Sequence, residues 1–170
     1  MGTRRLTLLR HGQARADAVA EDFERPLTRR GTIEAGEMGR RILHRNLAPD
    51  LILASPAERA WATAEIVALA CNLDATHLEC ARELYLASAE TIWRLVTRRH
   101  PAPRHLLVCG HNPGLSHLAS RFGPNPQTRE LPTAGLATAL WHSAKWEGLQ
   151  PEGARECDLD DPESMADLWV

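Results

Sequence analysis

Three short apolar runs stand out along the chain, at residues 6–9, 51–54 and 106–109, and each ends abruptly in polar residues, proline or glycine. Runs of this length and composition are typical of strands buried on both faces of a sheet. A weaker alternating segment at residues 76–80 predicts a strand near an edge, and residues 136–141 predict the last strand. These positions predict a sheet whose central strands are covered on both sides.

Between these runs, apolar residues recur at steps of three and four, which predicts helices. The helices are expected from Thr28 to about residue 46, from about residue 57 to 71, from about 88 to 99, and from 113 through 122. The inner face of the first should consist of Ala35, Met38, Ile42 and Leu43. Strands alternating with helices predict a three-layer α/β fold: a doubly wound, mostly parallel sheet flanked by helices.

A change in composition near residue 148 predicts one domain at residues 1–147 and an acidic tail at residues 148–170. Seven acidic side chains in that tail face a single cation, Arg155. Such an imbalance favours a solvated, poorly ordered segment. Three apolar residues lie at the end of this tail, Met165, Leu168 and Trp169. They either pack back on the domain or bind a partner, and both interpretations stay open.

Composition limits the class of protein further. The 170 residues are 44% hydrophobic, enough for one buried core, and the formal net charge of -2 argues against a nucleic-acid binder with a broad basic surface. No apolar run approaches membrane-spanning length, and the first residues lack the core of a signal peptide. The four cysteines are far apart, which favours free thiols. We therefore expect a cytoplasmic protein that acts away from membranes; the sequence leaves its oligomeric state open.

Basic residues follow all three apolar runs. Arg10 and His11 follow the first, Arg59 lies one helical turn after the second, and His111 follows the third. In parallel sheets, ligands gather beyond the carboxyl ends of the strands, so these four side chains are expected to converge. The planar, permanently charged guanidinium groups make phosphate the best candidate ligand.

Two further signals support an anion site at this edge. Ser55 and Asn112 are favoured helix N-cap residues, and each is followed by a proline at a plausible first helical position. Two helix N-termini would then direct free amides toward the same place. The polar segment at residues 13–25 is expected to form a loop over the mouth of the site, but it has no motif that specifies a substrate.

The same residues resemble a known family. Arg10-His11-Gly12, the segment at residues 55–60 with a threonine at position 63, and the segment at residues 110–112 are similar to the three signature blocks of the histidine phosphatase superfamily, whose fold is named after phosphoglycerate mutase. The Arg-Pro-Leu-Thr segment at residues 25–28, followed by Gly31, and the short length resemble the small phosphohistidine phosphatases of the SixA type. The blocks run in family order between residue 5 and about residue 142. The resemblance implies a phosphoglycerate-mutase-like fold.

The resemblance also implies roles for the converging residues. His11 would be the nucleophile that forms a phosphohistidine intermediate, while Arg10 and Arg59 would bind the phosphoryl oxygens. His111 would add a further donor. This scheme requires no metal and no cofactor. The expected substrate is protein phosphohistidine or a small phosphorylated metabolite, and the alternative function is a phosphate or phosphoprotein recognition module without turnover.

An alkoxide leaving group would need a proton, and a carboxylic acid near the scissile bond is the natural donor. Glu83 is the candidate, because it falls after the predicted strand at residues 76–80, where mutase-like relatives place their acid. Its alternative interpretation is a surface glutamate. An imidazole leaving group would depend much less on such an acid.

Overall fold

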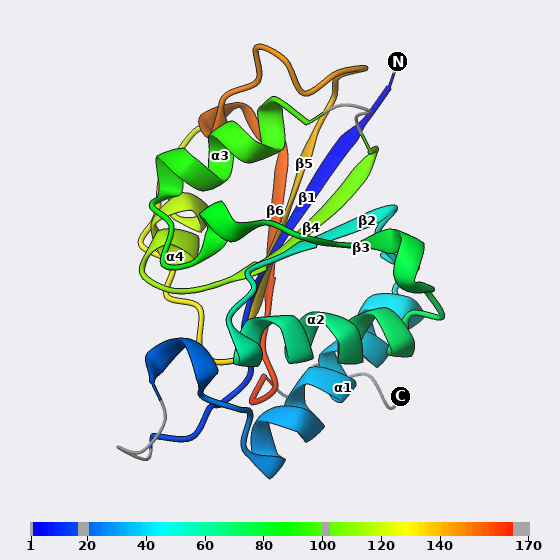
Figure 1. Ribbon diagram of the computed structural model, residues 1–170. Helices are drawn as coiled ribbons and strands as arrows, with labels where there is room; N and C mark the ends of the chain where they lie inside the picture. Colours follow the sequence, from blue (N-terminus) through cyan, green and yellow to red (C-terminus); the bar gives the residue numbers. More distant parts are fainter. Residues whose placement is uncertain (1, 17–20, 100–102, 165–170) are drawn as a thin grey trace.

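The computed structural model describes residues 2–16, 21–99 and 103–164, which form a six-stranded sheet with helices on both faces (Figure 1). The strands are ordered β3-β2-β4-β1-β5-β6. Their bounds are β1 (Arg4–Arg10), β2 (Leu51–Ala54), β3 (Leu78–Cys80), β4 (His105–Gly110), β5 (Leu136–Trp141) and β6 (Glu156–Asp160). Strands β1 to β4 are parallel to one another, while β5 pairs antiparallel with β1 and β6 antiparallel with β5. The predicted fold class is confirmed.

The three apolar runs are parallel neighbours, with β4 between β2 and β1. All six residues of β4 are buried, as expected for a strand with strands on both sides and helices on both faces. Because the three strands run in the same direction, the residues that follow them meet at one edge of the sheet. The predicted edge strand is shorter than expected, since residues Ala75–His77 form a 3₁₀ turn before β3.

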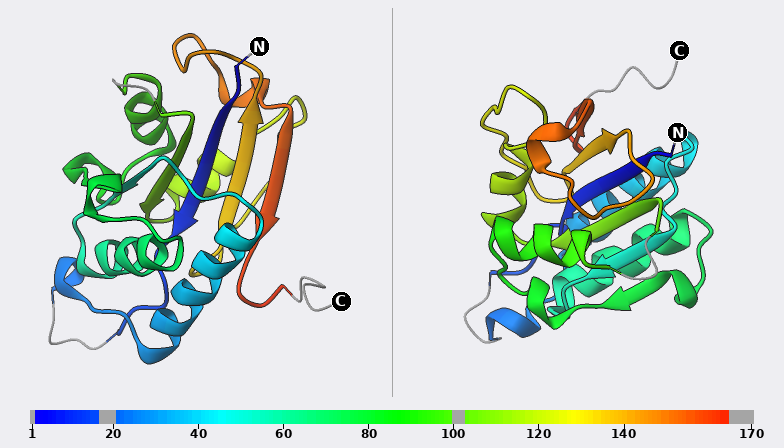
Figure 2. Two further views of the ribbon diagram at one scale, coloured as in Figure 1. Left: turned by 90° about the vertical axis from the view of Figure 1, so that its right-hand side faces the viewer. Right: turned by 90° about the horizontal axis from the view of Figure 1, so that it is seen from above.

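Helices cover both faces of the sheet, as the views in Figures 1 and 2 show. One face packs against α1 (Arg29–His44) and α2 (Glu58–Ala70), and the other against α3 (Ala89–Thr97) and α4 (Gly114–Ala119). The expected inner residues of α1 are buried except for Leu43, which is exposed because it lies at the margin of the apolar stripe. Within the described residues, no helix is both long and apolar enough to cross a membrane.

Side chains cap the starts of α1 and α3, whereas the caps predicted for α2 and α4 are displaced. Thr28 caps α1 by accepting a hydrogen bond from the amide of Gly31 at 3.0 Å. By contrast, α2 begins only at Glu58, so Ser55 lies outside it and accepts from the amide of Ala57 at 3.3 Å. Asn112 likewise precedes the start of α4 by two residues, although its Oδ1 accepts from the amide of Ser116 at 3.2 Å. The predicted caps are thus displaced, and Ser55 has another partner, described below.

The start of α1 is pressed against the turn after β1. A Cβ atom on Gly12 would lie 2.7 Å from the carbonyl oxygen of Gly31, so neither backbone leaves room for a side chain there. The amide of Thr28 donates to the carbonyl of Gln13 at 2.8 Å and closes the same junction. This contact holds the residues after β1 in place at the edge of the sheet.

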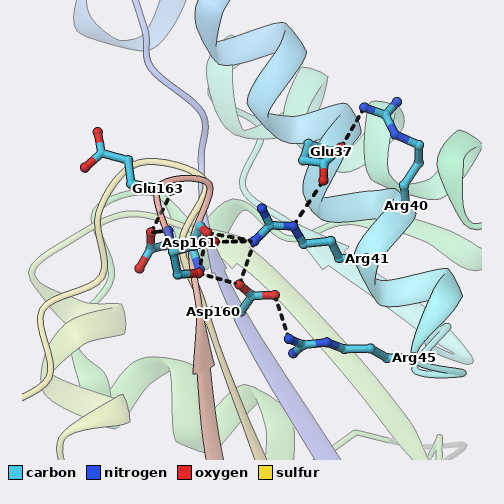
Figure 3. Close-up of polar contacts among 8 residues, drawn as sticks. Glu37, Arg40, Arg41, Arg45, Asp160, Asp161 and Glu163 are labelled. Atoms are coloured by element: carbon cyan, nitrogen blue, oxygen red, sulfur yellow. Dashed lines mark hydrogen bonds and ion pairs between the residues drawn. The ribbon is translucent and has the colours of Figure 1, made fainter. Parts of the chain in front are cut away.

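The prediction of a poorly ordered tail from residue 148 is wrong for strand β6, which pairs with β5 along its length. Asp160 is only 4% exposed and pairs with Arg41 at 2.8 Å and Arg45 at 3.4 Å (Figure 3). The acidic segment therefore finds its counter-charges on α1, more than a hundred residues earlier in the chain. Local composition does not reveal such partners. The apolar residues Met165, Leu168 and Trp169 lie outside the described residues.

Candidate active site

A cavity of about 320 Å³ opens at the carboxyl edge of the parallel strands. The four basic residues that were predicted to converge all line this cavity: Arg10, His11, Arg59 and His111. The lining also includes Asp22 and Arg25, from the segment between β1 and α1. Convergence follows from the order β2-β4-β1, because the segments after these strands and the start of α2 reach the same point.

His11 is held as a neutral imidazole whose Nε2 has a lone pair and no proton. Its Nδ1 lies 2.7 Å from the carbonyl oxygen of Gly12, which can only accept, so Nδ1 has the proton. Its Nε2 lies 3.3 Å from Nε of Arg59, a permanent donor, so Nε2 presents the lone pair. Burial lowers the pKa of His11 to about 4; the bond to Gly12 opposes this shift, and the charges of Arg59 and Arg10 add to it. An imidazole in this state is a nucleophile at neutral pH.

Arg59 lies between the two histidines and is almost fully buried. Its Nη2 is 3.4 Å from Nδ1 of His111, whose Nε2 is in turn 2.8 Å from the hydroxyl of Ser55. Burial lowers the pKa of His111 to about 3, with further contributions from His11 and Arg59. The role of Ser55 was missed: it positions His111 instead of capping α2.

Thr63 links Arg59 to Gly12, the residue that follows His11. The hydroxyl of Thr63 donates to the carbonyl of Arg59 at 2.7 Å, and it accepts from the amide of Gly12 at 3.0 Å. Thr63 is fully buried, so both bonds are shielded from water. The hydroxyl of Thr63 therefore fixes the backbone next to His11 relative to α2.

Arg10 approaches the cavity from the end of β1. Its Nη1 donates to the carbonyl of Leu131 at 2.9 Å. Its Nε is buried and has no hydrogen-bond partner among the residues that the structure describes. A guanidinium that is partly buried and keeps an unused donor is suited to an anionic ligand.

The comparisons with known proteins agree with this geometry. Residues 6–122 match the model of the histidine phosphatase superfamily (branch 1). The chain belongs to the histidine phosphatase superfamily. None of the curated proteins matches the chain significantly.

Solved structures of this superfamily share the fold along nearly the whole chain. The protein described as phosphohistidine phosphatase SixA from Nakamurella multipartitia aligns with a TM-score of 0.77 at 24% identity, over 96% of this chain and 99% of its own. That from Agrobacterium tumefaciens aligns with a TM-score of 0.74 at 28% identity, over 94% and 99%. A protein histidine phosphatase SixA complexed with tungstate aligns with a TM-score of 0.76 at 24% identity, over 93% and 97%.

An acidic residue that sequence analysis did not single out lies inside this histidine phosphatase site. Asp22, in a 3₁₀ turn (Asp22–Glu24), accepts hydrogen bonds from the hydroxyl of Tyr85 at 2.6 Å, from Arg59 at 3.0 Å and from Arg25 at 2.9 Å. These donors, that of Tyr85 foremost, hold the pKa of the Asp22 carboxyl far below its usual range. The sequence placed residues 13–25 over the mouth of the site, but no motif marks Asp22.

The structure does not bring Glu83 into the cavity. It lies in a 3₁₀ turn (Arg82–Leu84) after β3, its side chain is exposed, and it is not among the lining residues. Asp22 is the only carboxylate in the described lining. Within the described ranges, no group of three His, Cys, Asp or Glu side chains is arranged to hold a metal ion.

Three buried histidines predict a loss of stability in mild acid. Burial lowers the pKa values of His11 and His105 to about 4 and that of His111 to about 3, against an ordinary value of 6.5. Between pH 6.5 and 4 the unfolded chain binds protons at these sites and the folded chain does not, so the free energy of unfolding falls as the pH falls. Urea unfolding at pH 7 and pH 5 measures this change, which His105→Asn should make smaller. An equal free energy of unfolding at both pH values would contradict the prediction.

Proposed function

We propose that this protein is a phosphatase that uses a phosphohistidine enzyme intermediate and requires no metal, and that it acts on protein phosphohistidine or on a small phosphomonoester. The observation that supports this most directly is the neutral His11, whose Nε2 lone pair lies among the cations of the cavity. Phosphoryl transfer depends mainly on positioning and on fixed positive charge. Arg10 and Arg59 supply that charge, and a related fold binds the oxyanion tungstate.

In the first step, Nε2 of His11 attacks phosphorus, and the bond from phosphorus to the leaving group breaks. The lone pair becomes the new N–P bond, and the leaving group departs with the bonding electrons and takes up a proton from solvent. In the second step, water attacks the phosphohistidine, its oxygen bonds to phosphorus and it gives up a proton to solvent, and the N–P bond returns its electrons to Nε2. The products are inorganic phosphate and the starting imidazole. Arg10, Arg59 and His111 surround the phosphoryl oxygens in both steps.

The proton that a poor leaving group requires favours phosphohistidine as the substrate. Asp22 stays ionised at neutral pH, so it has no proton to donate, and Glu83 is exposed outside the cavity. An alkoxide is a poor leaving group without an acid, whereas the imidazole of phosphohistidine leaves readily. A cavity lined by cations and one ionised carboxylate therefore suits the cleavage of a P–N bond.

A comparison of three leaving groups tests this proposal. We expect hydrolysis of a phosphohistidine peptide and an aryl phosphate, and slower hydrolysis of an alkyl phosphate by a factor of about 10² or more, the usual contribution of general acid catalysis. EDTA should leave all three rates unchanged, and Glu83→Gln should do the same. Loss of activity on chelation would contradict the metal-free mechanism, and selective slowing of the alkyl phosphate by Glu83→Gln would show that Glu83 is the acid. Phosphate binding without turnover of any substrate would favour the alternative, a recognition module.

A further inference from the structure

Arg59 has no uncommitted donor nitrogen in this structure. Its Nε donates to Nε2 of His11 at 3.3 Å, its Nη1 to the backbone carbonyl of Asp22, and its Nη2 to the carboxylate of Asp22 at 3.0 Å and to His111 at 3.4 Å. These bonds use four of the five N–H groups of Arg59, so a phosphoryl group can bind it through two N–H groups only if some of these bonds are exchanged. The same arrangement covers the lone pair of His11, the atom that must attack phosphorus.

The carboxylate of Asp22 has the acceptor chemistry of a phosphoryl group. Its two oxygens accept from two guanidinium groups and one hydroxyl, those of Arg25, Arg59 and Tyr85. Charge-assisted bonds of this type are the ones that arginines make to phosphate. Asp22 therefore takes the position of an anion beside His11.

The exposed fractions of the Arg59 and Asp22 side chains indicate which of the two an incoming anion displaces. The side chain of Arg59 is 3% exposed and that of Asp22 is 49% exposed. A buried cation without an anion is costly, whereas a half-exposed carboxylate is hydrated at little cost when it leaves. Arg59 thus keeps its position, and Asp22 is the group that an incoming anion displaces.

On this basis we propose that Asp22 is a specificity-determining residue, an internal carboxylate that competes with the substrate phosphoryl group for Arg59. A ligand displaces it only by giving Arg59 stronger bonds than one carboxylate gives. A dianionic phosphoryl group does so, and a monoanion such as acetate does not. The inference deepens the proposed phosphatase function, since it concerns the same site, but it concerns binding and is separable from turnover.

Binding of inorganic phosphate and of acetate, measured by calorimetry on the full chain, tests the competition. Asp22→Asn keeps an oxygen that can accept from Tyr85 but loses the charge that pairs with Arg59. We expect the phosphate Kd of Asp22→Asn to be about tenfold lower or more than that of the wild type, which is the effect of one charge-assisted hydrogen bond. We also expect acetate binding to become measurable in this variant. Asp158→Asn is the matched control, since it removes a carboxylate that pairs with Arg45 at 3.1 Å away from the cavity. Its phosphate Kd should match that of the wild type.

Tyr85→Phe separates competition from a general change in the electric field of the cavity. This variant removes the donor at 2.6 Å that anchors Asp22 but changes no charge at neutral pH. If Asp22 competes with phosphate, the phosphate Kd of Tyr85→Phe also falls, by less than that of Asp22→Asn. If Asp22 acts only through the electric field, the phosphate Kd of Tyr85→Phe does not change, and the proposal is overturned.

A phosphate Kd in Asp22→Asn equal to or higher than that of the wild type would overturn the proposal as well. If kcat alone fell, Asp22 would be a positioning residue for Arg59. Phosphate binding is read without turnover, so a failure of the phosphatase proposal would be seen separately.

Discussion

We expect His11→Ala to lose turnover of every substrate, by a factor on the order of 10⁴ or more, because the variant lacks the nitrogen that is proposed to accept the phosphoryl group. Nε2 of His11 is the unprotonated ring nitrogen, because the carbonyl of Gly12 fixes the tautomer and Arg59 donates to Nε2. Incubation of the wild type with a phosphoryl donor and rapid quenching should trap a phosphate that is labile in acid and stable in base. The label should be absent from His11→Ala.

The control for this experiment is His105, a histidine as buried as His11 and also neutral at pH 7. It lies at the start of β4, at the opposite end of that strand from His111, and contacts the hydroxyl of Thr7 at 2.9 Å. His105→Asn should keep both the label and the turnover of its folded fraction. If the wild type bound phosphate but showed neither label nor turnover with aryl phosphate and phosphohistidine donors, the recognition module would replace the phosphatase.

Sequence analysis succeeded where the determinants are local. The apolar runs before Arg10, Ser55 and Gly110 are four residues or more in length, and each specifies a buried strand with its own composition. Because parallel strands end at the same edge of the sheet, the residues that follow them lie close together. The convergence of His11 and His111 therefore followed from strand direction alone.

The failures concern residues whose partners are distant in the chain. Asp22 lies in the cavity because of Arg59 and Tyr85, which are 37 and 63 residues away. Strand β6 pairs with β5, and its Asp160 also pairs with Arg41 of α1 over a separation of 119 residues. Glu83 was chosen from its position after a predicted strand, and the direction of a side chain in a short 3₁₀ turn does not follow from that position. Long-range ion pairs leave no periodic pattern in a sequence.

Arg59→Ala should slow turnover by about 10² to 10³ and weaken phosphate binding, the typical effect of removing one preorganised donor to the transition state. Unlike His11→Ala, this variant keeps its nucleophile, so the trapped phosphohistidine should still form, more slowly. Arg59→Lys should recover only part of the rate, because a single ammonium cannot bond the two histidines and the phosphoryl oxygens in the planar geometry of a guanidinium. Arg45→Ala removes an arginine that pairs with Asp158 and Asp160 away from the cavity, and should leave the rate of its folded fraction unchanged.

The pH profile distinguishes a direct role of Arg59 from a structural one. The positive charge of Arg59 is one of the causes that lower the pKa of His11 to about 4, so its removal should raise that pKa. Protonated His11 has no lone pair at Nε2, and activity is lost as the pH falls through its pKa. In Arg59→Ala the acid limb of the rate profile should therefore move to higher pH, and in Arg59→Lys, which retains the charge, it should stay closer to that of the wild type. An acid limb at the same pH in all three proteins, together with a lower rate in Arg59→Ala, would mean that Arg59 acts only by holding the site together.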